Sequence, residues 1–149
     1  EETLLIRAEA YILQKEYDKA LADLQVWVNN TINGPYTLTK EAIENWVDSY
    51  QYYTPNAPTP KKKLNPEFAI EEGQQEAYLQ FLLYARRYET MFSGLRWFDI
   101  KRYGIEIYRR TMQSGQPVSI GDMLKVRDNR CALQIPPDVI SAGITPNPR

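Results

Sequence analysis

The chain has 149 residues, enough for one domain that buries roughly 68–70% of the surface of its unfolded form. Its 18 basic and 19 acidic residues are interspersed and give a formal net charge of -1, so the sequence has no basic field for nucleic acid or an anionic membrane surface. It lacks histidine, the commonest general base and metal ligand, and its single cysteine, Cys131, excludes an intrachain disulfide. We therefore expect no enzyme, no metal site and no cofactor.

The first third of the chain predicts a pair of helices. Apolar residues recur at helical spacing in two runs, Leu4, Ala8, Tyr11 and Ile12, then Tyr17, Ala20, Leu21, Leu24, Trp27 and Val28. The spacing is similar to that of a tetratricopeptide repeat, and it fits equally well two amphipathic helices packed as core. The sequence Asn-Gly-Pro at 33–35 should end the pair. Thr39 can then cap a short helix whose apolar face includes Ile43, Trp46, Val47 and Tyr50.

Residues 51–66, QYYTPNAPTPKKKLNP, predict a proline-rich surface loop, because four prolines exclude a helix interior. Tyr52 and Tyr53 are our candidate ligand-binding residues in it. An exposed tyrosine ring offers a flat apolar face to a sugar and a hydroxyl to the polar edge of that sugar. Packing within the loop remains the alternative for both residues. The lysines at 61–63 should be solvated, and Tyr50 should pack in the core.

The second half predicts a long helix over residues 71–92, which ends or kinks at Gly94 and turns Phe92 towards the core. A period of two at Ile105 and Ile107, and again at residues 131–135, predicts an antiparallel strand pair. A short helix should follow in residues 136–143. The expected fold class is therefore mainly α, a tetratricopeptide-like helical scaffold with a small antiparallel strand pair near the C-terminus.

The segment SGLRWFDIKRYG, residues 93–104, places aromatic residues inside a cluster of charges. In a helix, Arg96, Asp99 and Arg102 share one stripe, where Asp99 can accept hydrogen bonds from both guanidinium groups. Trp97 and Phe98 leave this stripe and can enter the core. We expect a structural clamp between helix and strands, with ligand contact as the alternative. Catalysis is disfavoured, because two flanking cations would keep Asp99 ionised and make it a poor proton donor.

Two segments resemble one protein family. Residues 86–104, RRYETMFSGLRWFDIKRYG, resemble the signature RR-x-E-L-x-x-E-G-x-R-W-F-D-L-K-R-W near the C-terminus of SusD/RagB-like proteins, and residues 131–149 resemble the closing strand and tail of that family. Ser93 departs from the family, which usually has Glu before the glycine. The helix pair over residues 3–30 also matches the helical scaffold of the family. The matching positions of the signature are Arg86, Arg87, Glu89, Gly94, Arg96, Trp97, Phe98, Asp99, Lys101 and Arg102.

The resemblance implies a surface-exposed outer-membrane lipoprotein of Bacteroidetes that binds glycans or related nutrients and delivers them to a TonB-dependent porin of the SusC type. It implies that residues 1–149 form a single domain, the C-terminal part of such a protein and mainly scaffold. The lipid anchor that makes the membrane contact, and the secretion signal, would lie upstream. The alternative function is a helical protein–protein adaptor with no glycan affinity. No feature of the sequence indicates the carboxyl pair of a glycoside hydrolase.

Overall fold

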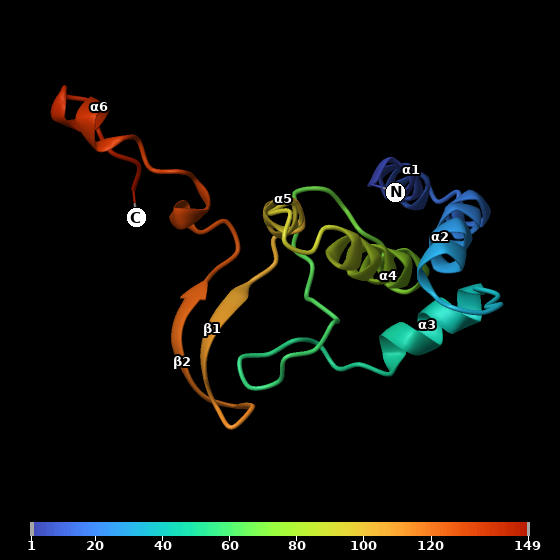
Figure 1. Ribbon diagram of the computed structural model, residues 1–149. Helices are drawn as coiled ribbons and strands as arrows, with labels where there is room; N and C mark the ends of the chain where they lie inside the picture. Colours follow the sequence, from blue (N-terminus) through green and yellow to red (C-terminus); the bar gives the residue numbers. More distant parts are fainter. Residues whose placement is uncertain (1, 149) are drawn as a thin grey trace.

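The computed structural model describes residues 2–148 and confirms a mainly helical fold with a small antiparallel sheet near the C-terminus (Figure 1). The elements are α1 (Glu2–Leu13), α2 (Tyr17–Thr31), α3 (Lys40–Asp48), α4 (Gln74–Glu89), α5 (Arg96–Arg102), β1 (Ile107–Gln113), β2 (Gln116–Leu124), a 3-10 turn (Asn129–Cys131) and α6 (Pro137–Ser141). The helices α1 to α4 gather on one side, and the hairpin and α6 lie on the other.

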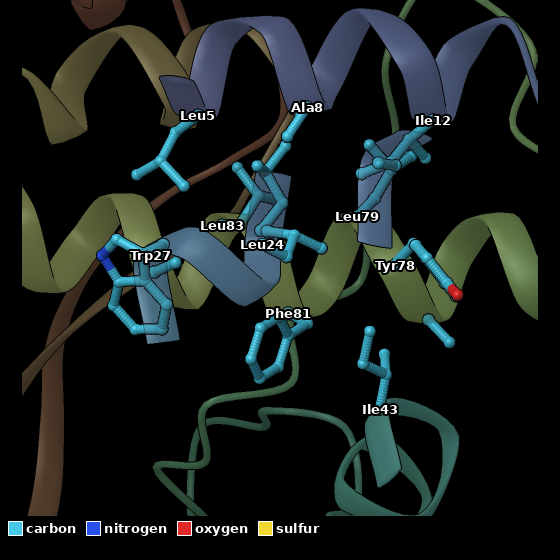
Figure 2. Packing of buried hydrophobic residues seen from close by; sticks show 14 of the residues in the cluster. Leu5, Ala8, Ile12, Leu24, Trp27, Ile43, Tyr78, Leu79, Phe81 and Leu83 are labelled. Carbon is cyan, nitrogen blue, oxygen red and sulfur yellow. The ribbon is translucent and has the colours of Figure 1, made fainter. Parts of the chain in front are cut away.

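Helix α4 is the centre of the core, because it packs against α1, α3 and α5. Figure 2 shows Leu5 and Ile12 of α1 facing α4 from one side, and Ile43 of α3 facing it from the other. Apolar contact on two sides explains why α4 buries residues around most of its circumference rather than along one stripe. The packing holds α4 in place and leaves one of its faces exposed.

The predicted helix pair is present as α1 and α2, which pack closely against each other. Ala8 and Ala20 are fully buried, and their small side chains let the two helices approach. Tyr17 at the start of α2 reaches α4, where its ring lies 5.4 Å from that of Tyr78. This packing is compatible with a tetratricopeptide-like unit.

Helix α3 begins as predicted, since the side chain of Thr39 accepts a hydrogen bond from the backbone N–H of Ala42 at 3.1 Å. Its apolar face buries Ile43 and Val47. Tyr50, which we expected in the core, lies past the end of the helix and is 37% exposed. Its ring instead meets the partly buried Trp46 edge to face at 5.4 Å.

The sheet uses a different second strand from the one predicted. β1 pairs with β2, from Ile107 opposite Leu124 to Gln113 opposite Gln116. A two-residue turn with positive φ at Ser114 and Gly115 reverses the chain directly after β1. The segment that follows the turn therefore takes the place beside β1 that was predicted for residues 131–135. Those residues form no strand, and Cys131 instead closes a 3-10 turn through its N–H to Asp128 at 2.8 Å.

The long helix ends earlier than predicted. α4 stops at Glu89, and positive φ values at Phe92 and Gly94 turn the chain towards α5. Phe92 therefore points away from the core and is 100% exposed. Gly94, expected to break or kink the helix, lies in the turn after it, because α4 has already ended at Glu89.

Candidate functional site

Asp99 forms a buried ion-pair cluster that joins α5 to α4. Its side chain accepts a hydrogen bond from Nε of Arg86 at 2.9 Å, and Nη1 of Arg96 lies 3.5 Å from its other oxygen. Asp99 is 3% exposed and Arg86 is 7% exposed. The predicted pairing of Asp99 with Arg96 is present, whereas Arg86, one helix away, is the closer partner.

The predicted pairing of Asp99 with Arg102 is wrong. Arg102 lies at the last position of α5 and extends towards α1, where its Nε donates to Glu9 at 2.8 Å. The hydroxyl of Tyr103 donates to the same carboxylate oxygen at 2.6 Å. Burial raises the pKa of Tyr103, and the Glu9 carboxylate adds to that rise. Two separate networks thus fasten α5, one to α4 and one to α1, and neither joins it to the strands.

The aromatic pair beside these charges also differs from our expectation. Phe98 is 59% exposed and Trp97 is half-buried outside the main core cluster. α5 has only seven residues, and the fully buried position on it is taken by Asp99. Ile100 takes the other position of α5 that packs against the core, so Trp97 and Phe98 face away from it.

The proline-rich loop, residues 51–66, lies between α4 and the hairpin and is bonded to both. Gln80 of α4 accepts from the N–H of Lys62 at 3.0 Å and donates to the carbonyl of the same residue. On the other side, Arg110 of β1 donates from Nε to the carbonyl of Pro55 at 2.7 Å, and further to the carbonyl of Thr54 and the hydroxyl of Tyr53. These bonds hold the loop in one conformation.

A cleft of about 640 Å³ lies where the loop, α4, α5 and β1 meet. α4 contributes an outward stripe of Tyr84, Arg87 and Tyr88, and Met91 follows just beyond the end of the helix. These positions have the i, i+3, i+4, i+7 spacing of one helix face. Tyr84 is 41% and Tyr88 54% exposed. Each ring also contacts a tryptophan, Tyr84 that of Trp46 at 4.9 Å and Tyr88 that of Trp27 at 6.3 Å, so a ligand can reach only the remaining ring surface. Other lining residues are Tyr53, Lys62, Arg96, Glu106 and Arg110.

Of the two tyrosines predicted to bind a ligand, Tyr53 lines the cleft and Tyr52 does not. The ring of Tyr53 stacks on that of Tyr108 at 5.3 Å, and Nζ of Lys62 lies 3.2 Å from the ring centre. These contacts occupy its faces, and its hydroxyl already accepts a hydrogen bond from Arg110, so the ring edge is the part that remains for a ligand. Tyr52 is exposed outside the cleft and donates its hydroxyl to Glu76 of α4 at 2.7 Å. Ligand binding by either residue stays a prediction.

Lys62 is half-buried rather than fully solvated, in contrast to the expectation for the lysine run. Burial lowers its pKa to about 7, and repulsion from Arg87, Arg96 and Arg110 adds to the effect. Its amine donates a hydrogen bond to the backbone carbonyl of Thr59 at 2.6 Å, an acceptor that carries no full negative charge. The positive charges of the cleft therefore lie close enough together to repel one another.

One signal for this cleft is present in the sequence, in the residues of α4 that face away from the core. Tyr84, Arg87 and Tyr88 fall between the apolar positions of the helix, on a face that the core does not need. Large aromatic rings on such a face are a mark of a contact surface. Arg110 had no comparable signal, because its role depends on a loop that lies 55 residues earlier in the chain.

Over residues 2–148 there is no cluster of three or more His, Cys, Asp or Glu side chains with the geometry to hold a metal ion. No helix in that described range is both long and apolar enough to cross a bilayer. Comparison with family models, with curated proteins and with solved structures gave no match. Two observations therefore bear on function, the lining of the cleft and the resemblance of the two sequence segments.

Proposed function

We propose that the chain is part of a non-enzymatic, surface-exposed outer-membrane lipoprotein that binds an oligosaccharide or a related nutrient and delivers it to a TonB-dependent porin of the SusC type. The cleft carries the binding part of this proposal. Tyr84 and Tyr88 are partly exposed on α4, and charged side chains line the same cleft. Flat apolar faces next to fixed hydrogen-bond donors are what a sugar needs for orientation. The porin and the location follow from the resemblance of residues 86–104 and 131–149 to SusD/RagB-like proteins.

The remaining parts of the chain act as scaffold in this proposal. The Asp99 cluster and the Glu9 network fix α5 against α4 and α1, and the bonds of Arg110 fix the loop. A wall that is already ordered loses little conformational entropy when a ligand binds. The rigid scaffold thereby contributes to affinity without touching the ligand.

Binding of the purified chain to an oligosaccharide array tests the proposal. Tyr88→Ala should weaken binding of the retained glycan roughly fivefold, the equivalent of about 1 kcal/mol of ring stacking. Tyr52→Ala is the matched control, because this tyrosine is similarly exposed but lies outside the cleft. Retention of no oligosaccharide at all, or equal losses in both variants, would contradict glycan binding in the cleft.

A specific observation also favours the second function, a helical adaptor that binds only protein. Met91, Phe92 and Phe98 are each more than half exposed around the turn between α4 and α5. Exposed apolar side chains grouped in this way are typical of contact surfaces between proteins. A chain that binds a SusC-type porin through this turn, loses that binding in Phe92→Ser and binds no glycan would be an adaptor.

A further inference from the structure

The charged side chains that line the cleft are strongly unbalanced in sign. Lys62, Arg87, Arg96 and Arg110 are basic, and Glu106 is the acidic residue among the lining residues described. Glu106 already accepts a hydrogen bond from the hydroxyl of Tyr108 at 2.6 Å. The chain as a whole has a net charge of -1, so this excess of positive charge is local. A hollow lined by one sign of charge concentrates ligands of the opposite sign.

The protein itself does little to neutralise these cations. Arg110 bonds two carbonyls and a hydroxyl, which use three of its five N–H donors and leave its charge uncompensated. Arg96 shares the single carboxylate of Asp99 with Arg86. Arg87 is exposed and makes no salt bridge within residues 2–148.

An anion in the cleft would relieve the repulsion between these groups. Burial of the amine, and after it the repulsion from Arg87, Arg96 and Arg110, lowers the pKa of Lys62. Arg87 is the best placed contact, since its planar fork is open to solvent and can bond a carboxylate or sulfate through two parallel N–H groups. The rings of Tyr84 and Tyr88 lie on the same helix face, beside that fork.

We propose that the cleft selects an acidic oligosaccharide, one whose sugar units carry carboxylate or sulfate groups, over a neutral one. This inference rests on the proposed glycan-binding function and names its substrate class. The aromatic rings would contact the sugar rings, and Arg87, with Lys62 in the same cleft, would bind the acidic substituent. Carboxylate and sulfate substituents share one chemical feature, a negatively charged oxygen attached to a sugar.

Calorimetric titration with three probes of equal length tests the inference: a galacturonic acid hexamer, a chondroitin sulfate hexasaccharide and the neutral cellohexaose. At low ionic strength at least one acidic probe should bind about tenfold or more tightly than cellohexaose, the effect of about one charge-assisted pair. The preference should shrink as salt is added, because exposed charges are screened. Tighter binding of the galacturonic acid hexamer would show that carboxylate groups suffice. Tighter binding of the chondroitin sulfate hexasaccharide, which carries both carboxylate and sulfate groups, would show that sulfate adds to the affinity.

Arg87→Gln is the decisive variant and should weaken binding of the preferred acidic probe about tenfold. Arg109→Gln is its control, because it removes one positive charge from an exposed residue of β1 that does not line the cleft. That control should change affinity by less than about twofold, as expected for a remote screened charge. Melting curves of both variants should match the parent chain, since neither side chain is buried.

The outcomes separate this inference from the proposed function. Equal affinity for cellohexaose and both acidic probes, or equal losses in the two arginine variants, would overturn the selection of acidic ligands and leave glycan binding intact. Failure of every oligosaccharide to bind would overturn the proposed function itself.

Discussion

At the scale of single residues, Asp99 and Arg86 form a buried ion pair at 2.9 Å on which stability should depend. Both side chains are almost fully buried, and Nη1 of Arg86 is already without a hydrogen-bond partner in the described part of the chain. Removing the carboxylate would leave a buried guanidinium with no counter-charge. Such a loss is far more costly than removal of a pair that water can replace.

We expect Asp99→Ala to lower the free energy of unfolding by about 3–5 kcal/mol. Denaturant unfolding followed by circular dichroism measures it. Glu67→Ala is the control, because the side chains of Glu67 and its partner Arg127 are 83% and 55% exposed, so the loss of this solvated pair should change stability little. Similar midpoints for Asp99→Ala and the parent chain would show that the buried cluster is not what holds α5 in place.

The amine of Lys62 should make stability depend on pH. Its pKa in the folded chain is lowered to about 7, while the unfolded chain should titrate at about 10.4. The ionisable groups around it are Tyr53, Arg87, Arg96, Glu106, Tyr108 and Arg110. Between the two pKa values the unfolded chain binds more protons, so the free energy of unfolding should rise with pH from about 7 to about 10. Below about pH 7 the dependence ends, because the amine is protonated in both states.

Urea unfolding of the parent chain and of Lys62→Met, compared between about pH 6 and about pH 10, isolates this contribution. The difference in stability between the two chains should change with pH across that interval, in the direction that favours the parent at high pH. Lys63→Met is the control, since that neighbouring lysine is exposed. A constant difference for Lys62→Met would show that the amine titrates normally.

At the scale of elements, the connection between α5 and the proline-rich loop depends on one glycine. Gly104 follows α5 with a φ of +56°, and a Cβ atom built on it would lie 2.3 Å from the carbonyl oxygen of Asn65. Asn65 approaches so closely because its N–H donates to the carbonyl of Tyr103 at 2.8 Å. Any larger residue must push the loop away from the end of the helix.

Gly104→Ala should therefore lower the free energy of unfolding by about 2–5 kcal/mol, from backbone strain and overpacking together. Gly143→Ala shares the positive φ but has open space around it, so it should cost only about 1 kcal/mol. Thermal and denaturant melts of the two variants give the comparison. Equal losses of stability in the two variants would mean that the proline-rich loop moves away from residue 104 without cost. The positive φ alone would then account for both losses.

At the scale of the whole molecule, the near-neutral composition conceals a separation of charge. The four cations of the cleft come from the loop, α4, α5 and β1 and span residues 62 to 110. Acidic partners of other basic residues lie elsewhere, as with Glu9 beside Arg102 and Asp23 beside Arg7. The net charge of the chain excludes an excess of positive charge over the whole surface. It does not exclude a local excess of positive charge, such as the one that lines the cleft.

The sequence by itself determined the helical elements, because apolar spacing and caps are local properties. The pattern from Leu4 to Val28 predicted α1 and α2, and Thr39 marked the start of α3. The strand pair was predicted, but with residues 131–135 as its second strand, whereas the turn at Ser114 and Gly115 makes β2 the partner of β1. Period-two patterns do not say which segment is the partner.

Only the tertiary structure decided the partners of the charged side chains and the position of the cleft. Arg102 was predicted to bond Asp99 three residues away and instead bonds Glu9, which lies 93 residues earlier in the chain. Arg110 is joined to Pro55 across 55 residues. Helical spacing limits which neighbours a side chain can reach along its own helix. Contacts between elements depend on how the core brings those elements together, and the local pattern of residues does not contain that information.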